Sequence, residues 1–148
     1  MAIGKRLKSL VDKLRPVEAP TSPWRPIGAP YPLLASLDPA SSGLAKAAGI
    51  IAIWHLGVRP QWLKIAATKD ISITLRSAVQ ARAILSYRPN GGVYVAWAPL
   101  PVTDLRGQAQ YLRDHLKPLL QATYLEAEID AVPDTKPVAF PFPPGTLE

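Results

Sequence analysis

The stretch AGIIAIWHLGVRPQWLKIAATKDI, residues 48–71, decides the fold, because two apolar runs stand on either side of a short Gly/Arg/Pro joint. Residues 49–56 and 61–66 have the composition of strands. The joint contains Gly and Pro, which supply turn geometry. After the second run, Thr68 or Asp70 can cap a helix. The stretch therefore predicts a β-hairpin that leads into a helix.

The hydrophobic spacing continues this pattern through the middle of the chain. The first helix is predicted to run to about Leu85, and the RPNGG turn then leads to a third strand, GVYVAWAPL, at residues 92–100. A last helix starts at Thr103 and ends before Pro118. The order β-β-α-β-α predicts an α+β fold: a small three-stranded, mainly antiparallel sheet with helices packed on it, flanked by proline-rich extended arms.

Composition limits the class of protein. A chain of 148 residues that is 48% hydrophobic can bury one core, and it has no cysteine for disulfides or thiolate metal sites. Its uncharged stretches are interrupted by Pro or Gly, or are shorter than the about 20 apolar residues that a membrane span needs. The basic N-terminus lacks the apolar region of a secretory signal. We therefore expect a soluble, cytoplasmic chain without a transmembrane segment.

Charge and proline divide the chain into four parts. Most of the net charge of +6 lies in residues 1–15, which are predicted to form a basic amphipathic helix. Residues 16–47 form a proline-rich strap, and residues 48–121 form the α+β domain. Residues 122–148 form a C-terminal extension that ends in a Pro/Phe tail.

The N-terminal helix offers an apolar stripe that includes Leu7, Leu10 and Leu14. A helix of this length is marginal alone, so we expect it to dock on its own domain or on a partner protein. A membrane surface and nucleic acid are the alternatives for this helix, since its remaining faces are cationic.

The order of elements and several motifs resemble the GIY-YIG nuclease domain of excision-repair nucleases and intron homing endonucleases. The residues that carry the resemblance are GII at the start of the first strand, KIA on the second, the TKDI helix start and the ending YLRDHLKPLLQ, in which Leu112, Pro118 and Gln121 have the family's spacing. The resemblance covers residues 49–121. The resemblance implies that the chain has the family's fold but lacks the Gly-Ile-Tyr and Tyr-Ile-Gly motifs that give the family its name.

The same resemblance predicts that catalysis is lost. The family's two tyrosines, its arginine and its metal-holding glutamate correspond here to Ile51, Lys64, Thr74 and Ala109. Phosphodiester hydrolysis needs a positioned nucleophile and charge compensation, commonly by a metal held on carboxylates. Residues 49–121 contain no glutamate at all. We therefore expect a degenerate domain that is not an enzyme and has no metal site and no cofactor; a divergent metal-dependent nuclease is the least favoured alternative.

Binding of nucleic acid without cleavage is the second hypothesis. Cations on the N-terminal helix, the second strand and the first domain helix could contact phosphates. The candidate residues are Lys5, Arg6, Lys8, Lys64, Lys69, Arg76 and Arg82. The same residues are also typical of ordinary solvated helix faces.

The leading hypothesis is a structural subunit that binds protein partners in a larger assembly, such as a multi-subunit complex or a virus particle. Proline-rich arms with spaced aromatic residues suit docking into grooves of another chain. The candidate anchors are Leu7, Leu10, Leu14, Trp24, Tyr31, Phe140 and Phe142.

Overall fold

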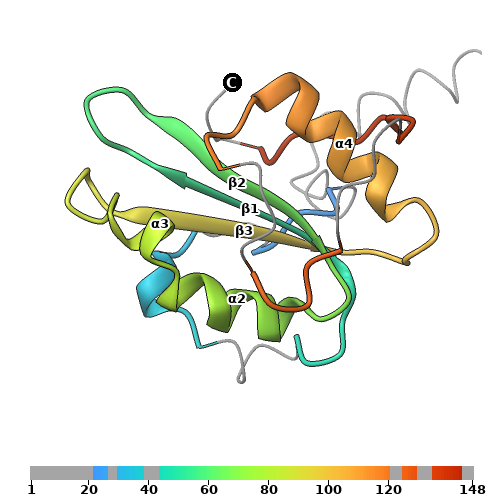
Figure 1. Cartoon of the computed structure of the whole chain (residues 1–148), viewed down its shortest axis with the longest axis horizontal. Coiled ribbons are helices and arrows are strands. Elements are labelled where there is room, and N and C mark those ends of the chain that lie inside the picture. The colour runs from blue at the N-terminus through green and yellow to red at the C-terminus, as the bar shows by residue number, and fades with distance from the viewer. Residues whose placement is uncertain (1–21, 27–29, 39–43, 121–124, 130–134, 145–148) are drawn as a thin grey trace, which may run out of the picture.

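The computed structural model describes residues 22–26, 30–38, 44–120, 125–129 and 135–144. Its elements in chain order are the 3-10 turn η2 (Leu34–Ser36), β1 (Gly49–His55), β2 (Gln61–Thr68), α2 (Ile71–Gln80), α3 (Arg82–Leu85), β3 (Val93–Pro99) and α4 (Leu105–Leu116). Figure 1 shows one sheet between two layers, with α4 on one side and α2 and α3 on the other. The helix predicted for residues 1–15 lies outside the described residues.

The sheet has the strand order β2-β1-β3, and β1 is antiparallel to both neighbours. The predicted fold class is therefore confirmed: an α+β domain with a three-stranded antiparallel sheet and helices packed on it. Within the described residues no helix reaches the length and apolarity that a membrane crossing requires.

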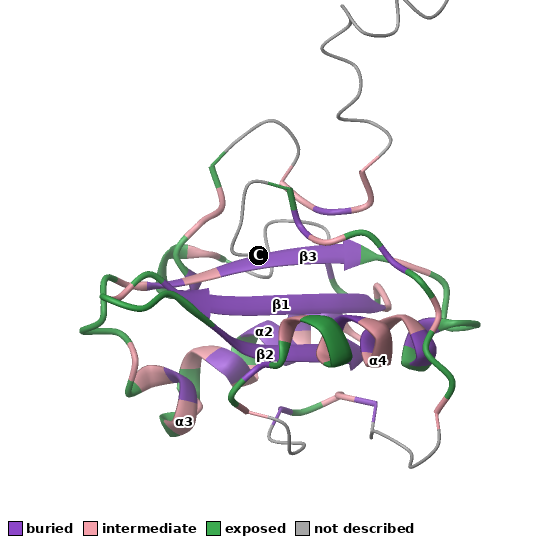
Figure 2. Ribbon diagram, turned by 90° about the horizontal axis from the view of Figure 1, so that it is seen from above, coloured by how far each residue is buried: buried purple, intermediate pink, exposed green. Residues whose placement is uncertain are grey.

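Side chains of β1 alternate between two hydrophobic cores. Ile50, Ala52 and Trp54 face the α4 layer, whereas Ile51 and Ile53 face the α2 layer. Every residue of β1 is buried, as Figure 2 shows for the central strand. A strand that is covered on both faces has apolar residues at successive positions. This explains why apolar and polar residues do not alternate in GIIAIW.

A β-bulge interrupts the pairing of β1 with β2. Ile53 pairs with Lys64 and Trp54 pairs with Trp62, so Leu63 is the extra residue. The bulge places Trp62 on the same face as Trp54, and their rings pack edge to face with centroids 5.3 Å apart. Strict alternation would have put Trp62 on the opposite face.

The first domain helix starts as predicted but ends earlier. Asp70 caps α2 by accepting a hydrogen bond of 3.2 Å from the backbone N–H of Ile73. The prediction of one helix to Leu85 is wrong, because Ala81 has an extended conformation with φ −74° and ψ 119°. This break turns α3 so that Ile84 is buried in the core of the α2 layer.

The last helix agrees with the prediction. α4 ends at Leu116, and Lys117 takes the left-handed conformation that commonly follows a helix. Its buried residues are Leu105, Gly107, Ala109 and Leu112.

The free edge of β3 is covered by the N-terminal strap. The backbones of Arg25 and Trp97 exchange two hydrogen bonds, and the N–H of Val95 donates to the carbonyl of Pro32. An unpaired strand edge invites pairing with other chains, so this cover protects the sheet.

Two predicted anchors for a partner lie in the chain's own core. Trp24 is 1% exposed and Phe140 is 8% exposed, and their rings contact each other with centroids 5.7 Å apart. The indole N–H of Trp24 also donates a 2.7 Å hydrogen bond to the Pro141 carbonyl. This corrects the expectation that both rings are available to another chain: the described parts of the strap and of the C-terminal extension pack on the domain instead.

Candidate functional site

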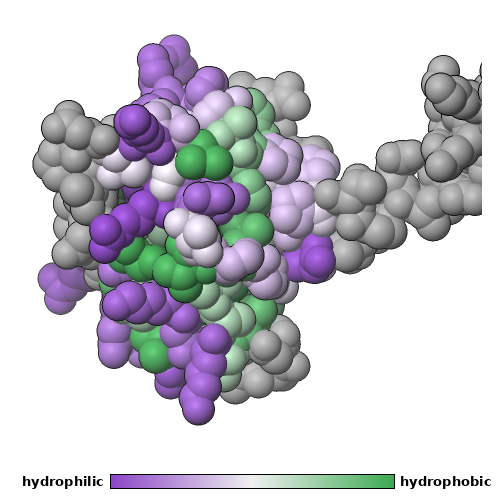
Figure 3. All heavy atoms as spheres, turned by 90° about the vertical axis from the view of Figure 1, so that its right-hand side faces the viewer, coloured by the Kyte–Doolittle hydropathy of each residue, from purple (hydrophilic) through white to green (hydrophobic). Residues whose placement is uncertain are grey.

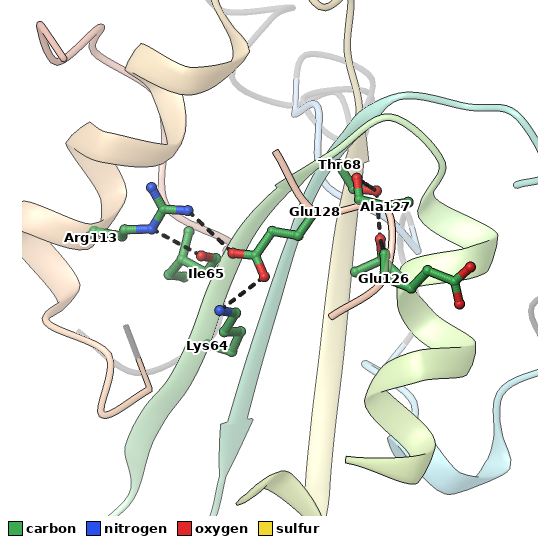
Figure 4. A network of polar contacts seen from close by, with 8 residues as sticks. Lys64, Ile65, Thr68, Arg113, Glu126, Ala127 and Glu128 are labelled. Atoms are coloured by element: carbon green, nitrogen blue, oxygen red, sulfur yellow. Dashed lines mark hydrogen bonds and ion pairs between the residues drawn. The ribbon is translucent and has the colours of Figure 1, made fainter. Parts of the chain in front are cut away.

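The outer edge of β2 carries the most extensive buried polar network that we find in the described residues (Figure 4). Segment 125–129 runs along this edge: the N–H of Ile129 donates to the Ala67 carbonyl at 2.7 Å, and the N–H of Lys69 donates to the Ala127 carbonyl at 3.1 Å. Arg113 of α4 takes the place of a strand donor, since its Nε–H donates to the Ile65 carbonyl at 3.1 Å. The edge is thus closed by α4 and the C-terminal segment together.

An ion pair lies at the centre of this network. The Nζ atom of Lys64 is 3.0 Å from Oε2 of Glu128, and their side chains are 1% and 2% exposed. The Nη2 atom of Arg113 is 3.8 Å from Oε1 of the same carboxylate. Figure 4 shows the two cations approaching Glu128 from different elements, so one residue of the C-terminal segment joins β2 to α4.

Burial sets the electrostatics of these cations. It lowers the pKa of Lys64, while the negative charge of Glu128 acts in the opposite direction and the positive charge of Arg113 adds to the decrease. Burial also lowers the pKa of Arg113, against the charges of Glu128 and Asp114. Removing charges from water is costly, and a close opposite charge offsets that cost.

Two threonines extend the network toward α2. The hydroxyls of Thr68 and Thr74 are hydrogen-bonded to each other, and both residues are buried. The Thr74 hydroxyl donates to the Glu126 carbonyl at 2.8 Å, and the Thr68 hydroxyl lies 3.1 Å from the Ala127 carbonyl. Segment 125–129 is therefore attached to the start of α2 as well as to β2.

The structure places the four positions that correspond to family catalytic residues in the interior. Ile51 and Thr74 are 0% exposed on the α2 side, and Lys64 is 1% exposed beneath the C-terminal segment. Ala109 is buried in the core of the α4 layer, on the opposite face of the sheet from Ile51. Under this correspondence, the four positions do not converge on one surface pocket.

The chemistry available in the network is limited. Glu128 is its one central carboxylate, because the exposed Glu126 side chain points away from Lys64 and Arg113 (Figure 4). Among the described residues no group of three or more His, Asp or Glu could hold a metal ion. The principal hollows lined by described residues do not include Lys64, Arg113 or Glu128. The arrangement suits the joining of elements.

The other candidate residues fall into three groups. Lys64 is wrong as a phosphate contact, because its ammonium is buried and paired. Lys69, Arg76 and Arg82 are exposed, and Tyr31 and Phe142 are partly buried against the α4 layer. The remaining candidates lie outside the described residues, namely Lys5, Arg6, Leu7, Lys8, Leu10 and Leu14.

His55 and the three strand tryptophans are buried. His55 is 3% exposed; its Nδ1 accepts a 3.1 Å hydrogen bond from the N–H of Gly57, and its ring stacks on Tyr87. Trp54 and Trp62 are buried on the α4 side of the sheet and Trp97 on the α2 side, so the three rings do not share one face.

The sequence interpretation missed Glu128 and Arg113. One signal could have found the acid: Lys64 stands in an apolar strand, LKIAA, and a buried lysine needs an anionic partner. Since residues 49–121 hold no glutamate, the segment after them was a natural source.

Comparison with known proteins adds no relative to this description. The chain matches no protein-family model, and neither the curated proteins nor the solved structures contain a significant match. The resemblance to the GIY-YIG domain therefore stays a prediction from the residues quoted above.

Proposed function

We propose that this chain is a non-catalytic structural subunit that binds a protein partner within a larger assembly. The observation that carries the proposal is the burial of Lys64 in an ion pair with Glu128. The position that corresponds to a catalytic tyrosine in the resemblance is here part of the interior. With that region closed, binding at the outer surface is the activity that the geometry supports best.

The β1–β2 turn is the surface that we assign to the partner. Val58 is fully exposed and Leu56 is 44% exposed, so two aliphatic side chains are in contact with water at one turn. Beside them lies an open hollow of about 570 Å³, which the turn shares with residues 89–91. Contiguous exposed apolar surface marks interaction sites, and this turn carries two exposed aliphatic side chains within three residues. Because Trp24 and Phe140 are buried, we assign the partner-binding surface to this turn and not to the arms.

Native mass measurement of the complex isolated from the source cells tests the proposal. We expect the full chain to be recovered with a stoichiometric partner. The pair of substitutions Leu56→Asp and Val58→Asp should abolish that complex, because each places a charge in the apolar contact.

The matched control is Val102→Asp, which changes an aliphatic residue that is 55% exposed in the loop before α4. It should leave the complex intact. Recovery of the full chain without a partner, or equal loss of the complex in both variants, would refute the assignment.

A further inference from the structure

A second surface lies at the opposite end of β2 from the β1–β2 turn. There the chain leaves β2 for α2 and enters α4, and an open hollow of about 390 Å³ forms between these segments and residues 136–138. Figure 3 faces this end of the molecule and shows hydrophilic side chains around hydrophobic ones. The charged residues in its lining are Lys69, Asp104, Arg106 and Lys136.

Three cations from separate parts of the chain converge on this hollow. Lys69 follows β2, Arg106 is in the first turn of α4, and Lys136 belongs to the C-terminal extension. All three are exposed, and within the described residues none of them forms an ion pair. Asp104 is the acid in the lining. Asp130 and Asp134 precede Lys136 in the sequence, and both lie outside the described residues.

The exposure of these cations points to a polyanion as their partner. A single ion pair in water contributes only about 0 to 1 kcal/mol, so a small anion would gain little here. A chain of phosphates gains more, because each cation that it meets releases counterions condensed on the polyanion. The concave shape also favours the convex phosphate backbone of a nucleic acid over a bilayer, since a plane of headgroups cannot enter a hollow.

We propose that this hollow binds the phosphate backbone of a nucleic acid through Lys69, Arg106 and Lys136. The inference goes beyond the proposed assembly role and does not depend on it. It differs from the surface predicted from the sequence, because Lys69 alone is common to both. Lys64, Arg76 and Arg82 do not line this hollow, whereas Arg106 and Lys136 do.

A titration of the full chain with a fluorescent DNA duplex of about 30 base pairs, over a series of salt concentrations, tests the proposal. The triple variant Lys69→Gln, Arg106→Gln and Lys136→Gln should bind about tenfold more weakly, and its salt slope should fall by about three. The charge-matched control is Arg76→Gln, Arg82→Gln and Arg88→Gln, three exposed arginines on α2, α3 and the turn before β3. The control should change the affinity by about threefold or less.

The substitution Asp104→Asn should change the affinity for DNA in the opposite direction. The Asp104 side chain makes no capping hydrogen bond, and Asn is also a good N-cap, so the helix should be retained. Removing the acid should tighten binding by about two- to fivefold. Equal losses in the two triple variants, no binding by the wild-type chain at low salt, or binding to anionic phosphatidylserine vesicles but not to DNA would each overturn the proposal.

Discussion

At the scale of single residues, Lys64 connects the sequence to the structure. It sits on a strand whose last seven residues are all buried, so its charge requires compensation inside the protein. Glu128 and Arg113 are far from it in sequence, and only folding brings the three together. The sequence shows that a partner is needed; it does not show which acid supplies it.

Removing one member of the Lys64–Glu128 ion pair should lower the free energy of unfolding more than replacing both members with apolar residues. Glu128→Ala removes the carboxylate that faces the buried ammonium of Lys64 and the guanidinium of Arg113, and we expect a loss of about 3 to 5 kcal/mol in the free energy of unfolding. The double variant Lys64→Met and Glu128→Leu should recover most of that loss, because apolar side chains of similar volume can replace a buried pair. Urea unfolding measures both. A Glu128→Ala protein as stable as the wild type would show that the ion pair does not stabilise the fold.

The lowered pKa of Lys64 predicts how stability changes with pH. Between its folded-state pKa and its ordinary value of 10.5, the unfolded chain holds a proton that the folded chain has released, so stability rises with pH in this window. Lys64→Met should abolish that part of the rise. Tyr31 acts in the opposite direction above its ordinary value of 10.0, because burial raises its pKa. Urea unfolding at several values from about pH 7 to about pH 10 therefore isolates the lysine. A parallel stability profile in the variant would contradict the assignment.

At the scale of elements, the sequence predicts strongly periodic segments well and local irregularities poorly. The three strands and α4 follow from continuous apolar runs and from leucine spacing. The bulge at Leu63 and the break at Ala81 carry no Gly or Pro signal, because tertiary packing of Trp62 and Ile84 favours them. Local pattern alone therefore could not place these irregularities.

Gly49, the first residue of β1, should tolerate no side chain. A Cβ atom there would overlap the Ala98 carbonyl oxygen on β3 and would lie 2.8 Å from the Ile71 side chain. Gly49→Ala should therefore cost about 1 to 3 kcal/mol in urea unfolding, since the backbones of β1 and β3 must move apart. Gly57→Ala, where the nearest atom would be 3.0 Å away, should cost less. The reverse order would mean that β1 and β3 are not this close.

At the scale of the whole molecule, the chain covers both edges of its own sheet. The strap pairs with β3, and segment 125–129 pairs with β2 through the bridge between Thr68 and Glu128. Composition predicted that the arms contact a surface, but it could not say whose surface. A buried tryptophan and a docking tryptophan look alike in sequence, and Trp24 proves to be the buried kind.

The central claim is that the buried network of Lys64, Arg113 and Glu128 is a closed structural joint and not a metal site. Incubation of the full chain with supercoiled plasmid and Mg²⁺ or Mn²⁺ tests it most directly, with gel separation of nicked and linear products. We predict that the plasmid stays supercoiled. Nicking that a chelator abolishes, and that Glu128→Gln also abolishes in a variant that is still folded, would contradict the claim, because the carboxylate would then hold a metal instead of joining β2 to α4.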